Sequence, residues 1–182
     1  MPQTPLKSTD IIALLQQMER YNQKHAAPLP HEEEVKAMWS GIGIRIADYH
    51  IVVAMGYVRE IMKYPRLSQV PGSKDWVMGI ANVRGNLLPI FDLHRFLGTV
   101  STPLKRETRI LSISSGDLSA GLLADEVFGM KYFDKDDYDA SLTYDVKWNN
   151  YLNGGYLIDD QKWIIFDMQR LIENENFLHV AK

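Results

Sequence analysis

Two apolar runs joined by one tight turn fill the stretch from Trp76 to Asp92, and this pattern restricts the chain to a fold built on β-hairpins. Glycine adopts positive φ without steric cost, so Gly85-Asn86 predicts a two-residue type II′ turn between the runs. Side chains alternate between the two faces of a strand, which places Asn82 and Arg84 on one otherwise apolar face beside the turn. An amide and a guanidinium in that position indicate a candidate functional surface.

A second copy of this unit follows 75 positions later. The matching positions are Gly79 with Gly154, Ile90-Phe91-Asp92 with Ile165-Phe166-Asp167, Arg95 with Arg170 and, more weakly, Val58 to Tyr64 with Val127 to Tyr132. Such repetition predicts two related β-units, each closing with a hairpin and a short helix. At the turn, residues 82–85 correspond to residues 157–160, which contain no Asn, Arg or Gly. The shared pattern therefore leaves open whether Arg84 is a binding residue or an ordinary solvated turn residue.

Composition and charge limit the classes of protein. The 182 residues, 46% of them hydrophobic, suit one ordinary domain or two small, closely packed ones. A net charge of −3 argues against a nucleic-acid or anionic-membrane surface, since both need clustered Lys and Arg. The absence of cysteine excludes disulfides and thiol catalysis. No stretch of about 18 apolar residues is present, so we expect a soluble, cytoplasmic protein without direct membrane insertion.

The first part of the chain predicts a helical extension. Helix-capping residues at 8–10 precede an apolar stripe of Ile11, Leu14, Leu15 and Met18, which indicates an amphipathic helix. A proline-containing connector follows at residues 26–30, so we assign residues 1–35 to this extension. A short helix is marginal alone, and its stripe is expected to dock on its own domain or on a partner.

The rest of the chain predicts a mostly β fold in residues 36–178. From Trp39 the apolar period is two, and about ten short strands follow, separated by Gly, Pro and Asp turns. Asp92 is placed to cap a helix at residues 93–97, and Asp167 is placed to cap a C-terminal helix that reaches Phe177. This spacing is typical of a barrel or a sandwich.

Groups that could perform catalysis do not converge in the sequence. The five histidines are scattered, and none pairs with another at metal-ligand spacing. Asp92 and Asp167 are explained as helix caps, while Asp125 and Glu126 would point to opposite faces of a strand. We therefore expect no catalytic residue, no metal and no cofactor. A hydrolase that acts through Asp125 or Glu126 is the enzymatic alternative.

The region from Val70 to Leu93, with its Gly79, Asn82-Val-Arg84-Gly85 and Pro89-Ile-Phe-Asp92 motifs, resembles the signature of the CheW-type coupling domain of bacterial chemosensory systems. The resemblance extends in the same order to Val58-Arg-Glu60-Ile61, Thr108-Arg-Ile110, Gly121 to Val127, Gly154-Gly155 and Ile165-Phe-Asp167. It covers about residues 39–178. The resemblance implies two five-stranded SH3-like β-barrels with short helices, which agrees with the internal repeat.

The same resemblance implies an adaptor rather than an enzyme. Coupling proteins of this type bridge the cytoplasmic tip of a methyl-accepting chemoreceptor to the regulatory domain of a CheA-type histidine kinase, at membrane-associated receptor arrays. By position, the residues implied to line the receptor-binding groove between the barrels are Val58, Glu60, Ile61, Asn82, Arg84 and Gly85. Residues that contact the kinase cannot be identified from this sequence, because exposure is not visible in it.

The segment from Met38 to Ile44 resembles the opening of the coupling proteins of the type IV pilus (twitching motility) pathway. The long N-terminal extension also favours that pathway over a flagellar chemotaxis array. Two further alternatives remain: a CheW-like regulatory domain cut from a kinase, and an SH3-like module that binds proline-rich peptides.

Overall fold

The structure is a computed structural model that describes residues 15, 17–18, 21, 37–99, 103–116 and 118–182. The chain separates into two compact units, Met1–Val35 and Lys36–Lys182. Most of the predicted N-terminal helix lies outside the described residues. Its described members, Leu15, Gln17, Met18 and Tyr21, are helical.

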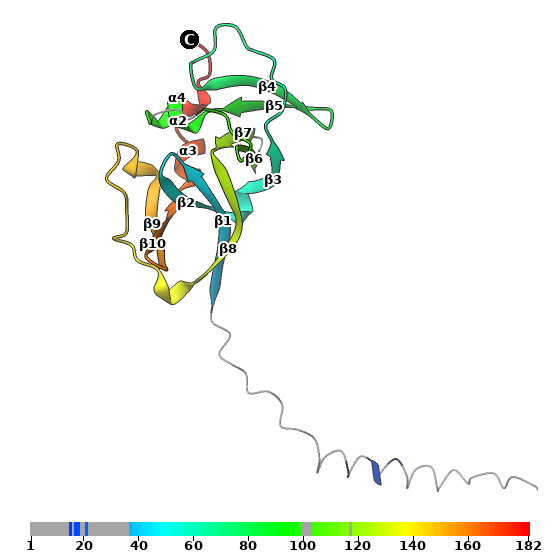
Figure 1. Cartoon of the computed structure of the whole chain (residues 1–182). Coiled ribbons are helices and arrows are strands. Elements are labelled where there is room, and N and C mark those ends of the chain that lie inside the picture. The colour runs from blue at the N-terminus through cyan, green and yellow to red at the C-terminus, as the bar shows by residue number, and fades with distance from the viewer. Residues whose placement is uncertain (1–14, 16, 19–20, 22–36, 100–102, 117) are drawn as a thin grey trace, which may run out of the picture. The chain divides into compact units, whose positions relative to one another are not determined.

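The unit Lys36–Lys182 contains two five-stranded sheets (Figure 1). Sheet A has the strand order β8-β1-β2-β10-β9. Its strands are β1 (Met38–Ile46), β2 (Tyr49–Ala54), β8 (Glu126–Asp134), β9 (Leu152–Ile158) and β10 (Gln161–Phe166). Only the β2–β10 pair is parallel; the other neighbours are antiparallel.

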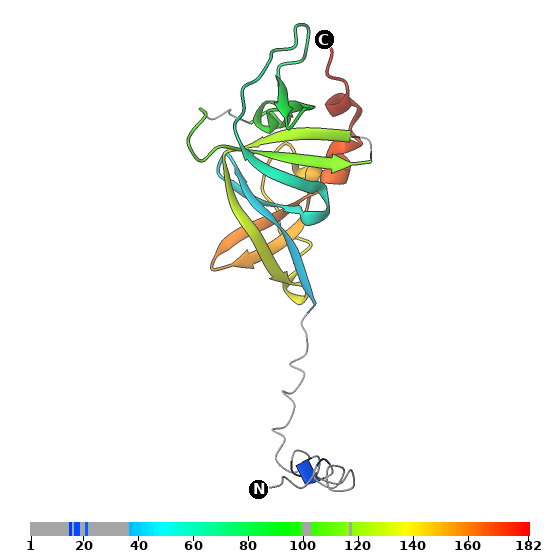
Figure 2. The same ribbon diagram turned by 90° about the vertical axis from the view of Figure 1, so that its right-hand side faces the viewer.

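Sheet B has the strand order β3-β6-β7-β5-β4. Its strands are β3 (Val58–Lys63), β4 (Val77–Val83), β5 (Asn86–Phe91), β6 (Arg109–Ser115) and β7 (Leu118–Ala124). Here the single parallel pair is β5–β7. Figure 2 shows the two sheets one above the other. The predicted mostly β fold with two five-stranded units is confirmed.

The remaining elements are short. They are the 3-10 helices η1 (Met55–Tyr57), η2 (Lys135–Asp137) and η3 (Asn149–Tyr151), and the α-helices α2 (Leu93–Leu97), α3 (Met168–Ile172) and α4 (Glu175–Leu178). The cap on α2 is as predicted, because the Asp92 side chain accepts from the backbone of His94 and Arg95, and Gly98 ends the helix in the left-handed region.

The predicted continuous helix from Asp167 to Phe177 is wrong. The Asn174 side chain accepts hydrogen bonds from the backbone N–H groups of Asn176 and Phe177, which starts a new helix. A side chain that caps a second helix competes with the backbone bonds that would continue the first. The segment therefore forms α3 and α4 in succession.

The internal repeat is visible in both topology and hydrogen bonding. The β4–β5–α2 unit and the β9–β10–α3 unit occupy equivalent places in the two sheets. Equivalent bonds are Asp92 N to Trp76 O and Asp167 N to Tyr151 O, both 2.8 Å, and Arg95 Nη1 to Asp75 O (3.0 Å) and Arg170 Nη1 to Asn150 O (2.8 Å). The sequence repeat therefore specifies the same local structure twice.

A glycine with positive φ holds the same place in each copy. Gly79 has φ 142°, and Gly154 has φ 57°. Beside each of them a loop residue forms an isolated bridge, Ser68 with Ile80 and Asp139 with Gly155. A Cβ on Gly79 would lie 2.5 Å from the Ser68 carbonyl oxygen, so the close approach of loop and strand requires glycine.

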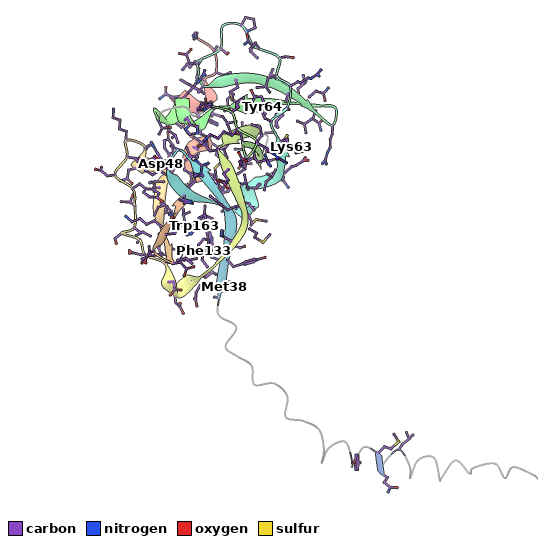
Figure 3. The ribbon with its side chains drawn as sticks, in the orientation of Figure 1. Met38, Asp48, Lys63, Tyr64, Phe133 and Trp163 are labelled. Carbon is purple, nitrogen blue, oxygen red and sulfur yellow. The ribbon has the colours of Figure 1, made fainter. Side chains whose placement is uncertain are left out.

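One apolar core joins the two sheets. Its fully buried members include Ile44, Ile46 and Ile51 from sheet A, and Leu111, Ile113 and Leu122 from sheet B. Smaller clusters fill each barrel, around Ile90 and Ile110 in sheet B and around Phe133 and Trp163 in sheet A (Figure 3). The exposed apolar residues of the two sheets lie mainly on the edge strands and at the ends of hairpins.

We predict that Gly79→Ala lowers the free energy of unfolding by about 2–4 kcal/mol, because the new Cβ meets a fixed carbonyl and the backbone conformation disfavours any other residue. Chemical denaturation measures this loss. Gly56→Ala is the matched control, since a Cβ there meets nothing within 4 Å. Equal stability of the Gly79 variant and the wild type would contradict the assigned loop–strand contact.

The surroundings of His50 predict that the stability of the domain depends on pH. The His50 ring stacks on Phe128 and meets Trp163 edge-on, each at 5.1 Å between ring centroids. Burial lowers the pKa of His50 below its ordinary value of 6.5, and the charge of Arg45 lowers it further. The unfolded chain therefore binds the proton more readily than the folded one does.

The pKa of His50 is lower in the folded protein than in the unfolded chain. Its contribution to the free energy of unfolding is therefore fully present above the unfolded pKa of 6.5, and it is lost as the pH falls through the folded pKa. We expect the free energy of unfolding to decrease below pH 6.5, and His50→Phe to remove part of that decrease while retaining the ring packing. Urea denaturation across this range tests it. An unchanged pH slope in the variant would exclude His50 as a source.

Candidate protein-interaction surface

The β4–β5 turn differs from the predicted one. Val83 pairs with Asn86, so the two turn residues are Arg84 (φ 53°) and Gly85 (φ 88°). Two positive φ values fit a type I′ turn, which matches the twist of a hairpin, and the predicted type II′ turn at Gly85-Asn86 is wrong. The Asn82 Oδ1 atom accepts from Gly85 N at 2.9 Å. This bond supports an arginine in a conformation that few residues other than glycine adopt.

Arg84 forms an ion pair that joins the two edges of sheet B. Its Nη2 atom lies 2.6 Å from Glu60 Oε1, and so links the β4–β5 turn to β3, the strand at the opposite edge of the sheet. The Arg84 side chain is 79% exposed and that of Glu60 is 33% exposed. An exposed ion pair contributes only about 0–1 kcal/mol to stability. It places the exposed guanidinium of the turn beside a carboxylate of β3.

The six residues implied by the family resemblance all belong to sheet B, on β3 and on the β4–β5 hairpin. The structure brings Glu60 together with Arg84, and Asn82 together with Gly85. Val58 packs on the core shared by the two sheets. Ile61 is 39% exposed and, by the alternation along β3, points away from the face that carries Glu60.

A seventh residue, Leu87, belongs to the same hairpin and was not predicted. Its side chain is 72% exposed, and it pairs directly with Asn82 across the hairpin. Directly opposed residues project from the same side of a sheet, so Leu87 and Asn82 share a face. The alternation places Leu87 on the Asn82 face from the sequence alone. The alternation cannot show that this face is left uncovered by the rest of the described domain.

Asp125 and Glu126, the residues of the hydrolase alternative, have structural partners. Asp125 is buried, and its Oδ2 atom accepts from Ala47 N at 2.7 Å and lies 3.2 Å from Nε2 of the fully buried His94. Glu126 pairs with Arg45 at 3.4 Å. These contacts connect α2 and the β7–β8 junction to the β1–β2 turn. They stabilise the junction of the two sheets.

Among the residues that the structure describes, no three His, Asp or Glu side chains gather as a metal site would require. Within the same described ranges, no helix is both long enough and apolar enough to cross a membrane.

Comparison with known proteins identifies the family. The model of the CheW-like domain matches residues 40–176, and the chain belongs to this family. The chain is 40% identical to Protein PilI of Pseudomonas aeruginosa over 92% of its own length and 94% of that protein. It is 28% identical to Chemotaxis protein CheW of Bacillus subtilis, over 51% of this chain and 60% of that one.

A solved structure shares the fold. The crystal structure of the scaffolding protein TtCheW from Thermoanaerobacter tengcongensis matches with a TM-score of 0.67 and 21% identity, covering 76% of this chain and 95% of that one. The resemblance to the coupling family inferred from the sequence motifs is thereby confirmed.

Proposed function

We propose that this protein is a non-enzymatic adaptor that couples a methyl-accepting chemoreceptor to a CheA-type histidine kinase, in a chemosensory pathway that controls type IV pilus twitching motility. It would act in the cytoplasm at membrane-associated receptor arrays. Membership of the CheW-like family supports the adaptor role. The extended similarity to PilI, which includes most of both chains, supports the pilus pathway over a flagellar one.

The single observation that carries the proposal is the exposed ion pair of Glu60 and Arg84. The other residues of the proposed receptor contact, Val58, Ile61, Asn82 and Gly85, belong to the same strand and hairpin as this pair. A mixed apolar and charged surface on sheet edges suits an amphipathic helical hairpin, because apolar contacts supply affinity and charges fix the orientation. The ion pair uses only Nη2 of Arg84. The rest of this exposed guanidinium faces a partner carboxylate in the proposed complex.

We predict that Arg84→Glu weakens binding to a purified chemoreceptor tip by about 1–3 kcal/mol, because it removes the cation and places two carboxylates together. The melting temperature should change little, since the side chain is exposed and packs on few atoms. Titration calorimetry and thermal unfolding measure the two effects.

Lys162→Glu provides the matched control. Lys162 is also exposed and lies on the equivalent hairpin of the other repeat, so the charge reversal is the same while the place differs. Binding that survives Arg84→Glu in a folded protein would contradict the assigned receptor surface.

A further inference from the structure

Leu87 has the most exposed large apolar side chain in the described part of the chain, at 72%. It follows the β4–β5 turn, on a strand whose other residues are mostly buried against the core. Exposing a leucine to this extent forfeits the stabilisation that its burial would give. Single exposed apolar residues are common, so exposure alone does not assign a role.

The internal repeat provides a control within the same molecule. Lys162 pairs with Leu157 in the second hairpin as Leu87 pairs with Asn82 in the first. The two positions are equivalent, and both hairpins have two turn residues with positive φ. Lys162 is exposed, and its strand forms normally. The fold therefore does not require an apolar side chain at this position, and the leucine calls for another explanation.

The neighbours of Leu87 indicate that explanation. Asn82, its cross-strand partner, shares its face, with the two Cβ atoms about 4.5–5.5 Å apart by the geometry of opposed residues. Asn82 also holds the turn that presents Arg84. An apolar side chain thus lies beside an amide on one hairpin, and the turn of that hairpin carries the exposed guanidinium of Arg84.

We propose that Leu87 is the apolar anchor of the receptor-contact surface and determines which helix that surface accepts. This inference rests on the proposed function. The partner it specifies is an amphipathic helix that presents a carboxylate to Arg84 and an apolar side chain to Leu87. Residues three or four positions apart on a helix lie on one face, so a single helix can supply both. Central apolar contacts of this kind carry much of the binding energy of an interface, while the surrounding polar contacts exclude water.

The test measures binding of Leu87→Ser and Leu87→Lys to a purified chemoreceptor tip fragment. We expect about tenfold weaker binding for each variant, a loss in the range of an interface hot spot. The Lys variant introduces the residue that the other repeat already carries, so we expect it to retain the fold. Leu157→Ser is the control, because Leu157 is 56% exposed on the equivalent hairpin, and it should change affinity less than about twofold.

Salt dependence separates the two kinds of contact. Affinity of the Leu87 variants should fall with added salt as steeply as that of the wild type, because the Arg84 contact remains. Normal binding by both Leu87 variants, with binding lost in Arg84→Glu, would overturn the role of Leu87 and leave the proposed function standing. An equal loss in Leu157→Ser would also overturn it. Absence of binding by the wild type would overturn both.

Discussion

The apolar core shared by the two sheets is the constraint on which the rest of the structure depends. Sheet A contributes isoleucines from β1 and β2, and sheet B contributes residues of β6 and β7, so the central strands of both sheets are committed to the junction. The edge strands and hairpin ends remain at the surface. The buried contact of Asp125 with Ala47 N adds a polar bond at the same junction. Surfaces available to partners are therefore those that the core does not use.

The repeat explains how one scaffold acquires a specific surface. Both repeats share the positive-φ glycine, the two-residue turn and, in the helix after the hairpin, an arginine that donates to a backbone carbonyl before the hairpin. They differ at buried positions, where Ala81 and Leu88 correspond to Tyr156 and Trp163, and also at the exposed turn. One turn carries Arg84, paired with Glu60, and the other carries Asp159 and Asp160. Backbone requirements are thus satisfied twice, while the chemistry of the exposed turn is free to diverge. This difference supports a binding role for Arg84 over a purely structural one.

Local signals in the sequence were sufficient for most of the fold. Alternation of apolar residues located the strands, and Asp92 with Gly98 located α2, because caps act within a few residues. The type I′ turn was missed because it depends on the side chain of Asn82 as well as on glycine. The Glu60–Arg84 pair was implied as a shared surface, but its contact depends on how sheet B closes. Exposure of Leu87 likewise depends on what the rest of the chain leaves uncovered.

The central claim is that sheet B presents its β3 edge and β4–β5 hairpin to the receptor while the equivalent hairpin of sheet A stays free. Backbone amide NMR signals of the isotope-labelled protein, recorded while a receptor tip fragment is added, test this most directly. The account predicts shifts at residues 58–61 and 82–87, with signals at residues 157–162 unchanged. Shifts confined to residues 157–162, or to sheet A, would contradict it.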